Sequence, residues 1–358
     1  MSNFNGKCLN LTLFGESHGK YIGATLTNFP AGVLINDAKI QEFLRLRRPT
    51  TSFETSRQEQ DEYEFISGVF NGYSTGAPLT LLVKNKDVSS KDYDNIKDTP
   101  RPSHADYVAN LTFKGFNDYR GGGHFSGRLT TPLVIIGALL DDYLNKHYNV
   151  VIASHILKIK DVYDRLFDNY ENDLKIIENE DFKVLDKDAK AKMLEVINKA
   201  VIDNDSVGGV IETSILNLPV GLGQYWFNSL ESRLSSVMFA IPAVKSIEFG
   251  KGYEMTDYFG SQINDEFKIV DGKIITTTNN NGGINGGFTN GMPVNFKIAI
   301  KPTPSIGKLQ NTINLKTKEN TTLMINGRHD PCIVRRALIV INSMASLVIL
   351  DELLAKGK

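Results

Sequence analysis

The chain has 358 residues, of which 41% are hydrophobic and 23% charged, proportions typical of a folded, water-soluble protein. Its formal net charge of −1 excludes a global basic field for nucleic acid, and its N-terminal region lacks the apolar stretch of a signal peptide. The two cysteines, Cys8 and Cys332, define neither a disulfide framework nor a metal-ligand set. We therefore expect a cytoplasmic protein that binds no metal, nucleic acid or membrane.

Apolar periodicity predicts a mixed fold of the α/β (α+β) class. The elements expected in chain order are a helix capped by Asn36 or Asp37 and stopped by Pro49, strands at 62–69 and 78–84, helices at 130–147 and 188–202, a strand at 209–216, a helix capped by Asn228, a strand at 294–300 and a helix at 333–354. No fixed-period repeat and no linker rich in proline or serine divides them. We therefore predict one large domain over residues 1–358.

Three of these segments carry more specific expectations. Residues 158–192 are strongly charged and predict a surface excursion within the domain. The helix that begins inside this stretch is amphipathic and should bury Met193, Ile197 and Val201. The last helix is apolar but interrupted by polar residues such as Asn342, which favours a core helix over a membrane span.

Two histidines stand in short runs of small and polar residues rather than in apolar periodic segments. His18 lies in GESHG at residues 15–19, and His104 lies in RPSHAD, three residues after Arg101. Histidine is the side chain most easily poised to move a proton near neutral pH. The pair therefore indicates acid–base chemistry on an anionic substrate, with hydrogen-bonded loop histidines as the alternative.

Cationic residues cluster beside loops that are rich in glycine or proline. The run RGGGHFSGR at 120–128 leads into an expected helix, so its backbone N–H groups and its arginines suit an anion. Glycines within 279–291 would let a flat ligand approach the backbone closely. The segment KPTPSI at 301–306 combines a lysine with hydroxyl groups, which suits a phosphate-binding site. Taken alone, each of these loops is more simply explained as a structural turn, and each cationic cluster is more simply explained as a solvent-exposed face. Their combination indicates a site for phosphate and carboxylate groups.

Six motifs occur in an order that resembles the chorismate synthase family. They are GESHG, RPSHADY, DYRGGG, GGxxGGxxNG, KPTPSI and GRHDPC, and the resemblance extends from Phe14 to about Leu354. It implies a β-α-β sandwich fold, a homotetramer and reduced FMN as cofactor. It also implies a lyase that converts 5-enolpyruvylshikimate 3-phosphate to chorismate and phosphate by anti-1,4-elimination. That reaction is the last step of the shikimate pathway of aromatic amino acid biosynthesis.

The resemblance implies a role for each residue that matches a family motif. His18 would help phosphate to leave, His104 would balance charge at the reduced flavin, and Asp330 would relay a proton with the flavin. Ser17 and Ser126 match hydroxyl groups near substrate and flavin. The arginines that would clamp the substrate are Arg48, Arg101, Arg128 and Arg328. The flavin contacts would be His124, Phe125, Ser126, Pro242, Ala243, Gly286, Lys301, Pro302, Thr303, Pro304, Ser305 and Arg328.

The chain also departs from the family pattern. The residues concerned are His124 and Phe125 in place of an arginine and a serine, Leu129 in place of a glutamate, Phe53 and Glu54 where an arginine is common, and Arg335 where a proline is common. We expect the changed flavin loop to weaken FMN binding. The departures also leave open a non-catalytic paralogue that binds flavin or another anion.

Two further questions stay open at this level. A hydrolase using Ser17 and His18 is the third possibility, but adjacent residues rarely present nucleophile and base to each other. The reductant could be NADPH acting through the enzyme itself, or an external flavin reductase. The sequence carries no dinucleotide-binding fingerprint, which favours the external source.

Overall fold

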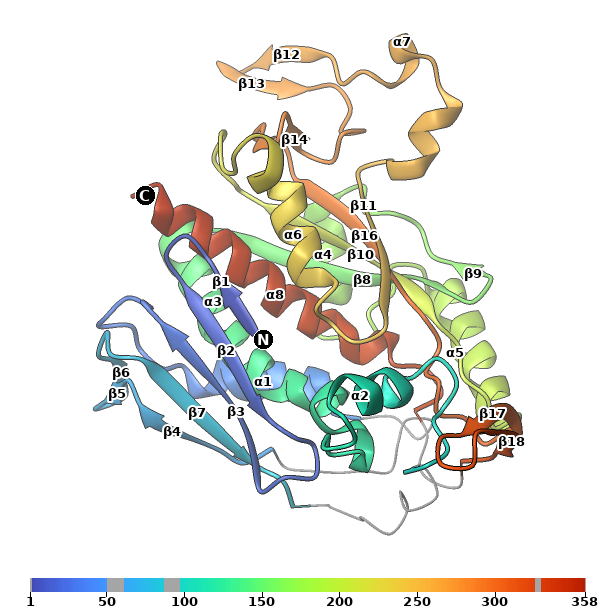
Figure 1. Ribbon diagram of the computed structural model, residues 1–358. Helices are drawn as coiled ribbons and strands as arrows, with labels where there is room; N and C mark the ends of the chain where they lie inside the picture. The colour runs from blue at the N-terminus through green and yellow to red at the C-terminus, as the bar shows by residue number, and fades with distance from the viewer. Residues whose placement is uncertain (1, 50–60, 87–96, 326–329, 358) are drawn as a thin grey trace.

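Two antiparallel sheets enclose a layer of helices in the computed structural model, which describes residues 2–49, 61–86, 97–325 and 330–357 (Figure 1). The first sheet has the strand order β1 (Asn3–Asn5), β2 (Asn10–Gly15), β3 (Tyr21–Thr27), β7 (Leu79–Lys84), β4 (Tyr63–Ser67). The second has the order β11 (Val244–Phe249), β16 (Val294–Ile300), β10 (Gly209–Leu216), β8 (Val151–Ile159), β9 (Val162–Tyr163).

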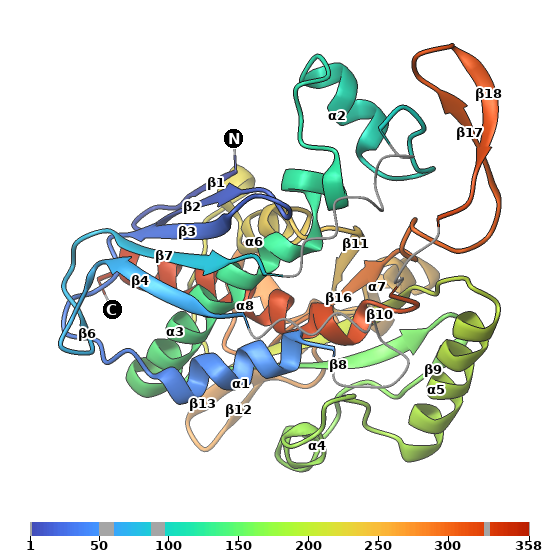
Figure 2. The same ribbon diagram turned by 90° about the horizontal axis from the view of Figure 1, so that it is seen from below.

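The helical layer joins the two sheets (Figure 2). Helix α3 packs against β3 and β7 of the first sheet, helix α8 packs against β8 and β10 of the second, and the two helices pack on each other. The helices are α1 (Asp37–Arg47), α2 (Asp106–Thr112), α3 (Thr130–Tyr148), α4 (Tyr170–Ile177), α5 (Lys187–Ile202), α6 (Leu230–Met238), α7 (Gly260–Ile263) and α8 (Val334–Ala355). This arrangement is the β-α-β sandwich that the resemblance implied.

Four small hairpins lie outside the two sheets in the part of the chain that the structure describes. They are β5 (Val69–Phe70) with β6 (Tyr73–Ser74), β12 (Phe267–Val270) with β13 (Lys273–Thr276), β14 (Ile284–Asn285) with β15 (Phe288–Thr289), and β17 (Gln310–Asn314) with β18 (Glu319–Leu323).

Helix α8 is buried on almost every side because it lies between a sheet and other helices. Its composition and length would allow it to cross a membrane, but 89% of its most apolar window is buried inside the protein. Its close contact with α3 depends on Gly137, because a Cβ atom there would lie 2.1 Å from the Cβ of Ser343. The expectation of a core helix is therefore confirmed.

The element predictions hold with two corrections. Strands β10 and β16 span the predicted residues. In α5 the predicted buried residue Val201 is 40% exposed, and Ala200 is buried instead, because the buried face of the helix advances by three residues after Ile197. The cap of α6 is Ser229 rather than Asn228, because Asn228 ends a short 3-10 helix. The Ser229 side chain accepts a hydrogen bond from the backbone N–H of Ser232 at 3.1 Å.

The charged stretch 158–192 contains β9, α4 and the first turns of α5. Apolar side chains from it form a small second core with Ala153 of β8, namely Phe167, Ile177 and Leu185. This lobe therefore packs onto the outer face of the second sheet.

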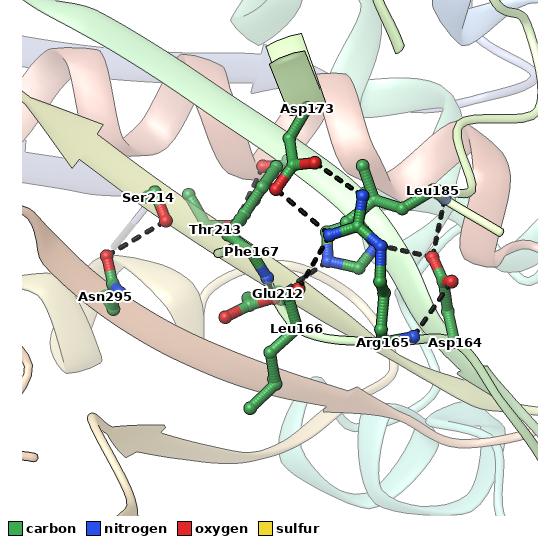
Figure 3. A network of polar contacts seen from close by, with 12 residues as sticks. Asp164, Arg165, Leu166, Phe167, Asp173, Leu185, Glu212, Thr213, Ser214 and Asn295 are labelled. Carbon is green, nitrogen blue, oxygen red and sulfur yellow. Dashed lines mark hydrogen bonds and ion pairs between the residues drawn. The ribbon is translucent and has the colours of Figure 1, made fainter. Parts of the chain in front are cut away.

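A buried ionic network links the lobe to the sheet (Figure 3). His155 of β8 lies between two carboxylates, with Nδ1 3.0 Å from Asp164 Oδ2 and Nε2 2.8 Å from Glu212 Oε2. Glu212 also accepts the backbone N–H of Phe167, and Asp164 accepts that of Leu185. Burial alone would lower the pKa of His155, but the hydrogen bonds to both carboxylates outweigh it and raise that pKa.

Candidate active site

The two histidines pack against neighbouring glycines of the loop before α3. A Cβ atom at Gly121 would lie 2.2 Å from Cε1 of His18, and one at Gly122 would lie 3.3 Å from Cε1 of His104. Both glycines have positive φ, 59° and 93°. Only glycine combines that backbone conformation with such close ring contact, so the loop brings together two histidines that are distant in sequence.

His104 is oriented by an aspartate and an arginine of its own motif. Its Nδ1 lies 2.6 Å from Asp106 Oδ1, and Arg101 donates to the same carboxylate through Nε at 2.7 Å and Nη2 at 2.8 Å. Burial would raise the pKa of Asp106, but hydrogen bonds from Arg101 and His104 hold it well below its ordinary range. The ionised carboxylate thus fixes the Nδ1–H tautomer of His104 and leaves Nε2 for chemistry.

Ser17 and His18 are both buried, and their side chains do approach each other, contrary to expectation. Ser17 Oγ lies 3.3 Å from His18 Nδ1, but it also donates a hydrogen bond of 3.3 Å to the carbonyl of Arg120. A hydroxyl group has one proton, so the proton given to Arg120 is not directed at His18. The geometry does not support a serine nucleophile with His18 as its base.

A cavity of about 1090 Å³ lies beside His104. Its lining includes the predicted residues His104, His124, Phe125, Ser126, Pro242, Ala243, Lys301, Thr303, Pro304, Ser305, Asp330 and Arg101. Sheet register explains part of this gathering, because Val244 of β11 pairs with Ile300 of β16. The residues just before one strand therefore meet those just after the other, and Lys301 N–H donates to the carbonyl of Ala243 at 3.0 Å.

The lining of this cavity fits a flavin mononucleotide. Its volume lies slightly above the range for ordinary ligand pockets, roughly 300–1,000 Å³, which leaves room for a ligand as large as FMN. Lys301 and Lys245 both line it, and among the residues that the structure describes neither forms an ion pair with a carboxylate. Burial, and then the charge of Lys245, lower the pKa of Lys301. A phosphate group would supply the missing negative charge, and Phe125 and Ile241 offer apolar surface to a ring system.

A smaller cavity of about 290 Å³ adjoins the first and is lined by arginines. The two cavities share the lining residues Ser126, Gly127, Thr130, Ile241, Pro242, Ile333 and Asp330. The arginines of the smaller cavity are Arg47, Arg48, Arg128 and Arg336, and its carboxylates are Asp61 and Asp330. Four guanidinium groups against two carboxylates leave a formal excess of two positive charges, which suits a polyanionic ligand.

Asp61 is the buried carboxylate that holds three of these arginines together. Arg128 Nη1 donates to its Oδ1, Arg48 Nε lies 3.2 Å from its Oδ2, and Arg47 Nη1 lies 3.8 Å from Oδ2. Burial would raise the pKa of Asp61, but the charges of Arg47 and Arg128 lower it. The ionised Asp61 therefore offsets the repulsion among guanidinium groups that would otherwise splay apart.

Two consecutive arginines of α8 hold the C-terminal end of α1. Arg335 donates to the carbonyl of Leu46 at 3.2 Å and to that of Arg48, while Arg336 donates through Nε to the carbonyl of Arg47 at 2.7 Å. Arg336 also donates through Nη1 to Asp330 Oδ2 at 2.6 Å. The last carbonyls of a helix have no partner within the helix, so these contacts stabilise the turn that presents Arg47 and Arg48.

The altered flavin loop has its own hydrogen bonds. His124 Nδ1 lies 2.9 Å from the carbonyl oxygen of Gly15, and its Nε2 contacts Ser2 Oγ. Both ring nitrogens of His124 are thus engaged by protein oxygens, which ties the N-terminal strand to the loop. Phe125 lines the larger cavity, and its ring lies 6.3 Å from that of Phe113.

The structure does not bring all of the predicted residues together. Ser17 and His18 line neither of the two cavities, although His18 packs against Gly121, which lines the larger one. Gly286 lies at the turn between β14 and β15, also outside both linings, and Pro302 is exposed beside the cavity that its neighbours line. Arg328 lies outside the described residues, as do Phe53 and Glu54.

Four site residues were missed by sequence reasoning. Arg47 and Arg336 belong to cationic clusters that indicate anion binding, but the sequence assigned them no individual role. Asp106 lies in the same motif as His104, so its spacing was an available signal. No local sequence pattern marks Asp61, because its role follows only from the arginines that contact it in the folded structure.

Comparison with known proteins shows the family of this chain. The family model described as chorismate synthase matches residues 9–354. The chain is 43% identical over 349 residues to the chorismate synthase of Pyrococcus abyssi, covering 98% of this chain and 97% of the relative. It is 42% identical over 356 residues to that of Methanosarcina barkeri, covering 99% and 97%. A crystal structure of chorismate synthase is similar with a TM-score of 0.77 at 27% identity, covering 98% of this chain and 93% of the other. The chain belongs to the chorismate synthase family.

Proposed function

We propose that this chain converts 5-enolpyruvylshikimate 3-phosphate to chorismate and phosphate, with the substrate in the arginine-lined cavity and reduced FMN in the larger one. The reaction breaks the allylic C–O bond to phosphate and a ring C–H bond, and it forms one new double bond. The observation that carries the proposal is the shared wall of the two cavities, which includes Ser126 and Asp330.

The charge of the substrate matches the cavity proposed for it. Two carboxylates and a phosphate monoester carry about −3.5 to −4 near neutral pH. Arg47, Arg48, Arg128 and Arg336 supply guanidinium groups that bind carboxylate and phosphate oxygens bidentately. Arg101, expected to clamp the substrate, lines the larger cavity rather than the arginine-lined one and is hydrogen-bonded to Asp106, so we assign it to the positioning of His104.

Three residues would donate or relay protons in the proposed reaction. His18, buried against Gly121, donates a proton to the departing phosphate. His104, fixed by Asp106, lines the cavity proposed for the flavin, and Asp330, at the wall between the cavities, would relay a proton with the flavin. When bound, reduced FMN supplies electron density as phosphate departs and recovers it as the ring hydrogen leaves. Ser126 offers its hydroxyl group at the wall between the cavities, and Ser17 contacts His18.

The remaining details are also proposals. Exposed apolar residues on β12 and β13, such as Ile269 and Ile274, support an oligomer, for which we propose a homotetramer. We propose a cytoplasmic enzyme whose FMN is reduced by an external source rather than by its own NADPH oxidation. The measurement that checks this is NADPH consumption by protein and FMN alone, which we expect to be absent.

One anaerobic assay tests the proposed activity. The protein is mixed with chemically reduced FMN and 5-enolpyruvylshikimate 3-phosphate, and chorismate and phosphate are followed together. We expect equal amounts of both products and no net oxidation of the flavin. Equal turnover with oxidised FMN, or with none, would contradict the role of the cofactor. FMN binding without any product would instead support the non-catalytic paralogue.

A further inference from the structure

We propose that Thr303 is a positioning residue for Asp330 and that Ser206, in turn, holds Thr303 in place. Both contacts run from a hydroxyl group to a backbone carbonyl. Thr303 Oγ1 donates to the carbonyl of Asp330 at 2.9 Å, and Ser206 Oγ donates to the carbonyl of Thr303 at 2.7 Å. The inference rests on the proposed function, because that function gives Asp330 its role as a proton relay.

Asp330 lies before the start of α8, so neighbouring segments have to hold it. Its side chain is held by Arg336, whose Nη1 donates to Oδ2 at 2.6 Å. Because Pro331 has no N–H, the carbonyl of Asp330 is the only hydrogen-bonding group of the peptide unit that joins these two residues, and Thr303 binds that group. The next carbonyl, that of Pro331, accepts the N–H of Val207 at 2.8 Å. Asp330 is thus held through its side chain and through its backbone.

The segment that follows α5 runs alongside the loop that follows β16. The N–H of Gly307 donates to the carbonyl of Asn204 at 2.9 Å. A Cβ atom at Gly208 would lie 2.3 Å from the carbonyl oxygen of Ile300, so only glycine allows the two backbones to approach this closely. Ser206 lies between these two contacts in the sequence, which places its hydroxyl group against the loop.

The hydroxyl group of Thr303 is committed to the protein, although Thr303 lines the larger cavity. A hydroxyl group has one proton, so Thr303 cannot donate to a bound flavin while it donates to the carbonyl of Asp330. We therefore assign this hydroxyl group to the positioning of Asp330 rather than to a hydrogen bond with the flavin.

The position of Asp330 matters because this residue lines both cavities. A displacement of about 1 Å in a reacting group can lower a rate by about a hundredfold. Loss of the contact from Thr303 should therefore lower kcat. It should change KM for the substrate little, because Asp61 holds three of the arginines of the smaller cavity.

Two substitutions at one position test the role of the hydroxyl group. Thr303→Val removes this group and keeps nearly the same volume, whereas Thr303→Ser keeps the group. We expect kcat at saturating reduced FMN to fall at least about tenfold in Thr303→Val and to stay within about twofold of the parent in Thr303→Ser. KM for the phosphorylated substrate, and the FMN dissociation constant from calorimetric titration, should stay within about threefold in both variants.

Thr256→Val is the matched control for these variants. The Thr256 hydroxyl also donates to a backbone carbonyl, that of Tyr253, at 2.9 Å, but on an exposed 3-10 helix at Gly252–Asp257. The control should keep the kcat of the parent. Ser206→Ala should lower kcat by a smaller factor than Thr303→Val does, because Ser206 acts through Thr303.

Hydrogen exchange followed by mass spectrometry tests the positioning without any turnover. The N–H of Val207 is bonded to the carbonyl of Pro331, so peptides that cover residues 204–210 report whether the segment before α8 stays in place. We expect exchange there to be at least about threefold faster in Thr303→Val than in the parent. Thr303→Ser and Thr256→Val should exchange as the parent does.

Three outcomes would overturn the positioning role. The first is a kcat or an exchange rate in Thr303→Val equal to that of the parent. The second is an equal fall of kcat in Thr303→Ser. The third is an FMN dissociation constant raised about tenfold or more in Thr303→Val, which would make the hydroxyl group a flavin contact. Faster exchange in Thr303→Val, together with a parent that makes no chorismate, would refute the proposed function and leave the contact between Thr303 and Asp330 standing.

Discussion

Arg101 binds Asp106 through two nearly parallel hydrogen bonds, Nε to Oδ2 at 2.7 Å and Nη2 to Oδ1 at 2.8 Å. The same carboxylate accepts from Nδ1 of His104 at 2.6 Å. A bidentate guanidinium–carboxylate pair is geometrically rigid, so it holds the imidazole ring in one orientation. Asp106 is thus a positioning residue for His104, and Arg101 supports it.

Asp106→Asn should lower kcat by about tenfold to a hundredfold while KM stays within about threefold, because the His104 tautomer is no longer enforced. Steady-state kinetics under anaerobic conditions checks this split. Asp205→Asn, which removes an exposed ion pair with Lys308, is the control and should leave kcat unchanged. A large fall in KM would contradict the prediction, since it would mean that a released Arg101 binds substrate better.

His18→Ala and His104→Ala should each lower kcat by at least about tenfold, since general acid–base groups contribute roughly 10²–10⁴-fold. Circular dichroism and thermal unfolding verify that each variant is folded. Near-normal rates in folded variants would mean that both histidines have only a structural role.

Asp61→Asn should lower the free energy of unfolding by about 3–5 kcal/mol, because three arginines would face one another around a neutral amide. Because the pKa of Asp61 is lowered in the folded state, its stabilisation is present above its unfolded pKa and is lost as pH falls through the folded pKa. Urea unfolding at neutral and acidic pH measures both effects. The variant should differ from the parent most at neutral pH, and an equal difference at both pH values would contradict the assignment.

His155→Gln should remove a pH dependence of stability. The pKa of His155 is raised in the folded state, so its contribution is full below about pH 6.5 and is lost as pH rises through the folded pKa. In the parent, this group should make the unfolding free energy decline with pH by up to about 1.4 kcal/mol per unit in that window. His147→Gln, at an exposed position on α3, should keep the slope of the parent. An unchanged slope in His155→Gln would refute the prediction.

Phe125→Ser combined with His124→Arg should tighten FMN binding by roughly 1–3 kcal/mol, because the pair restores charge-assisted hydrogen bonds in the flavin loop. Calorimetric titration with FMN measures the change. Phe125→Ser alone is the informative control, because His124→Arg also breaks the contacts with Ser2 and Gly15. Unchanged affinity in the double variant would show that the loop binds flavin through its backbone.

The sequence by itself determined the elements whose apolar periodicity is strong, and the motifs that carry chemistry. Strands β10 and β16 and helix α8 were predicted nearly to the residue, because side-chain spacing along one segment is a local property. His18 and His104 were singled out for the same reason, since their short motifs need no tertiary information. Those motifs and their order carried the resemblance to the family, and the family model that matches residues 9–354 shows the membership.

Only the tertiary structure decided which of these residues meet. Arg101 was expected to clamp the substrate yet is bound to Asp106, and Asp61, which lines the cavity proposed for the substrate, carries no motif of its own. Such contacts depend on the register between β11 and β16 and on how α8 meets the end of α1. Those relations join segments far apart in sequence, and their free energy depends on burial and charge that no local pattern encodes.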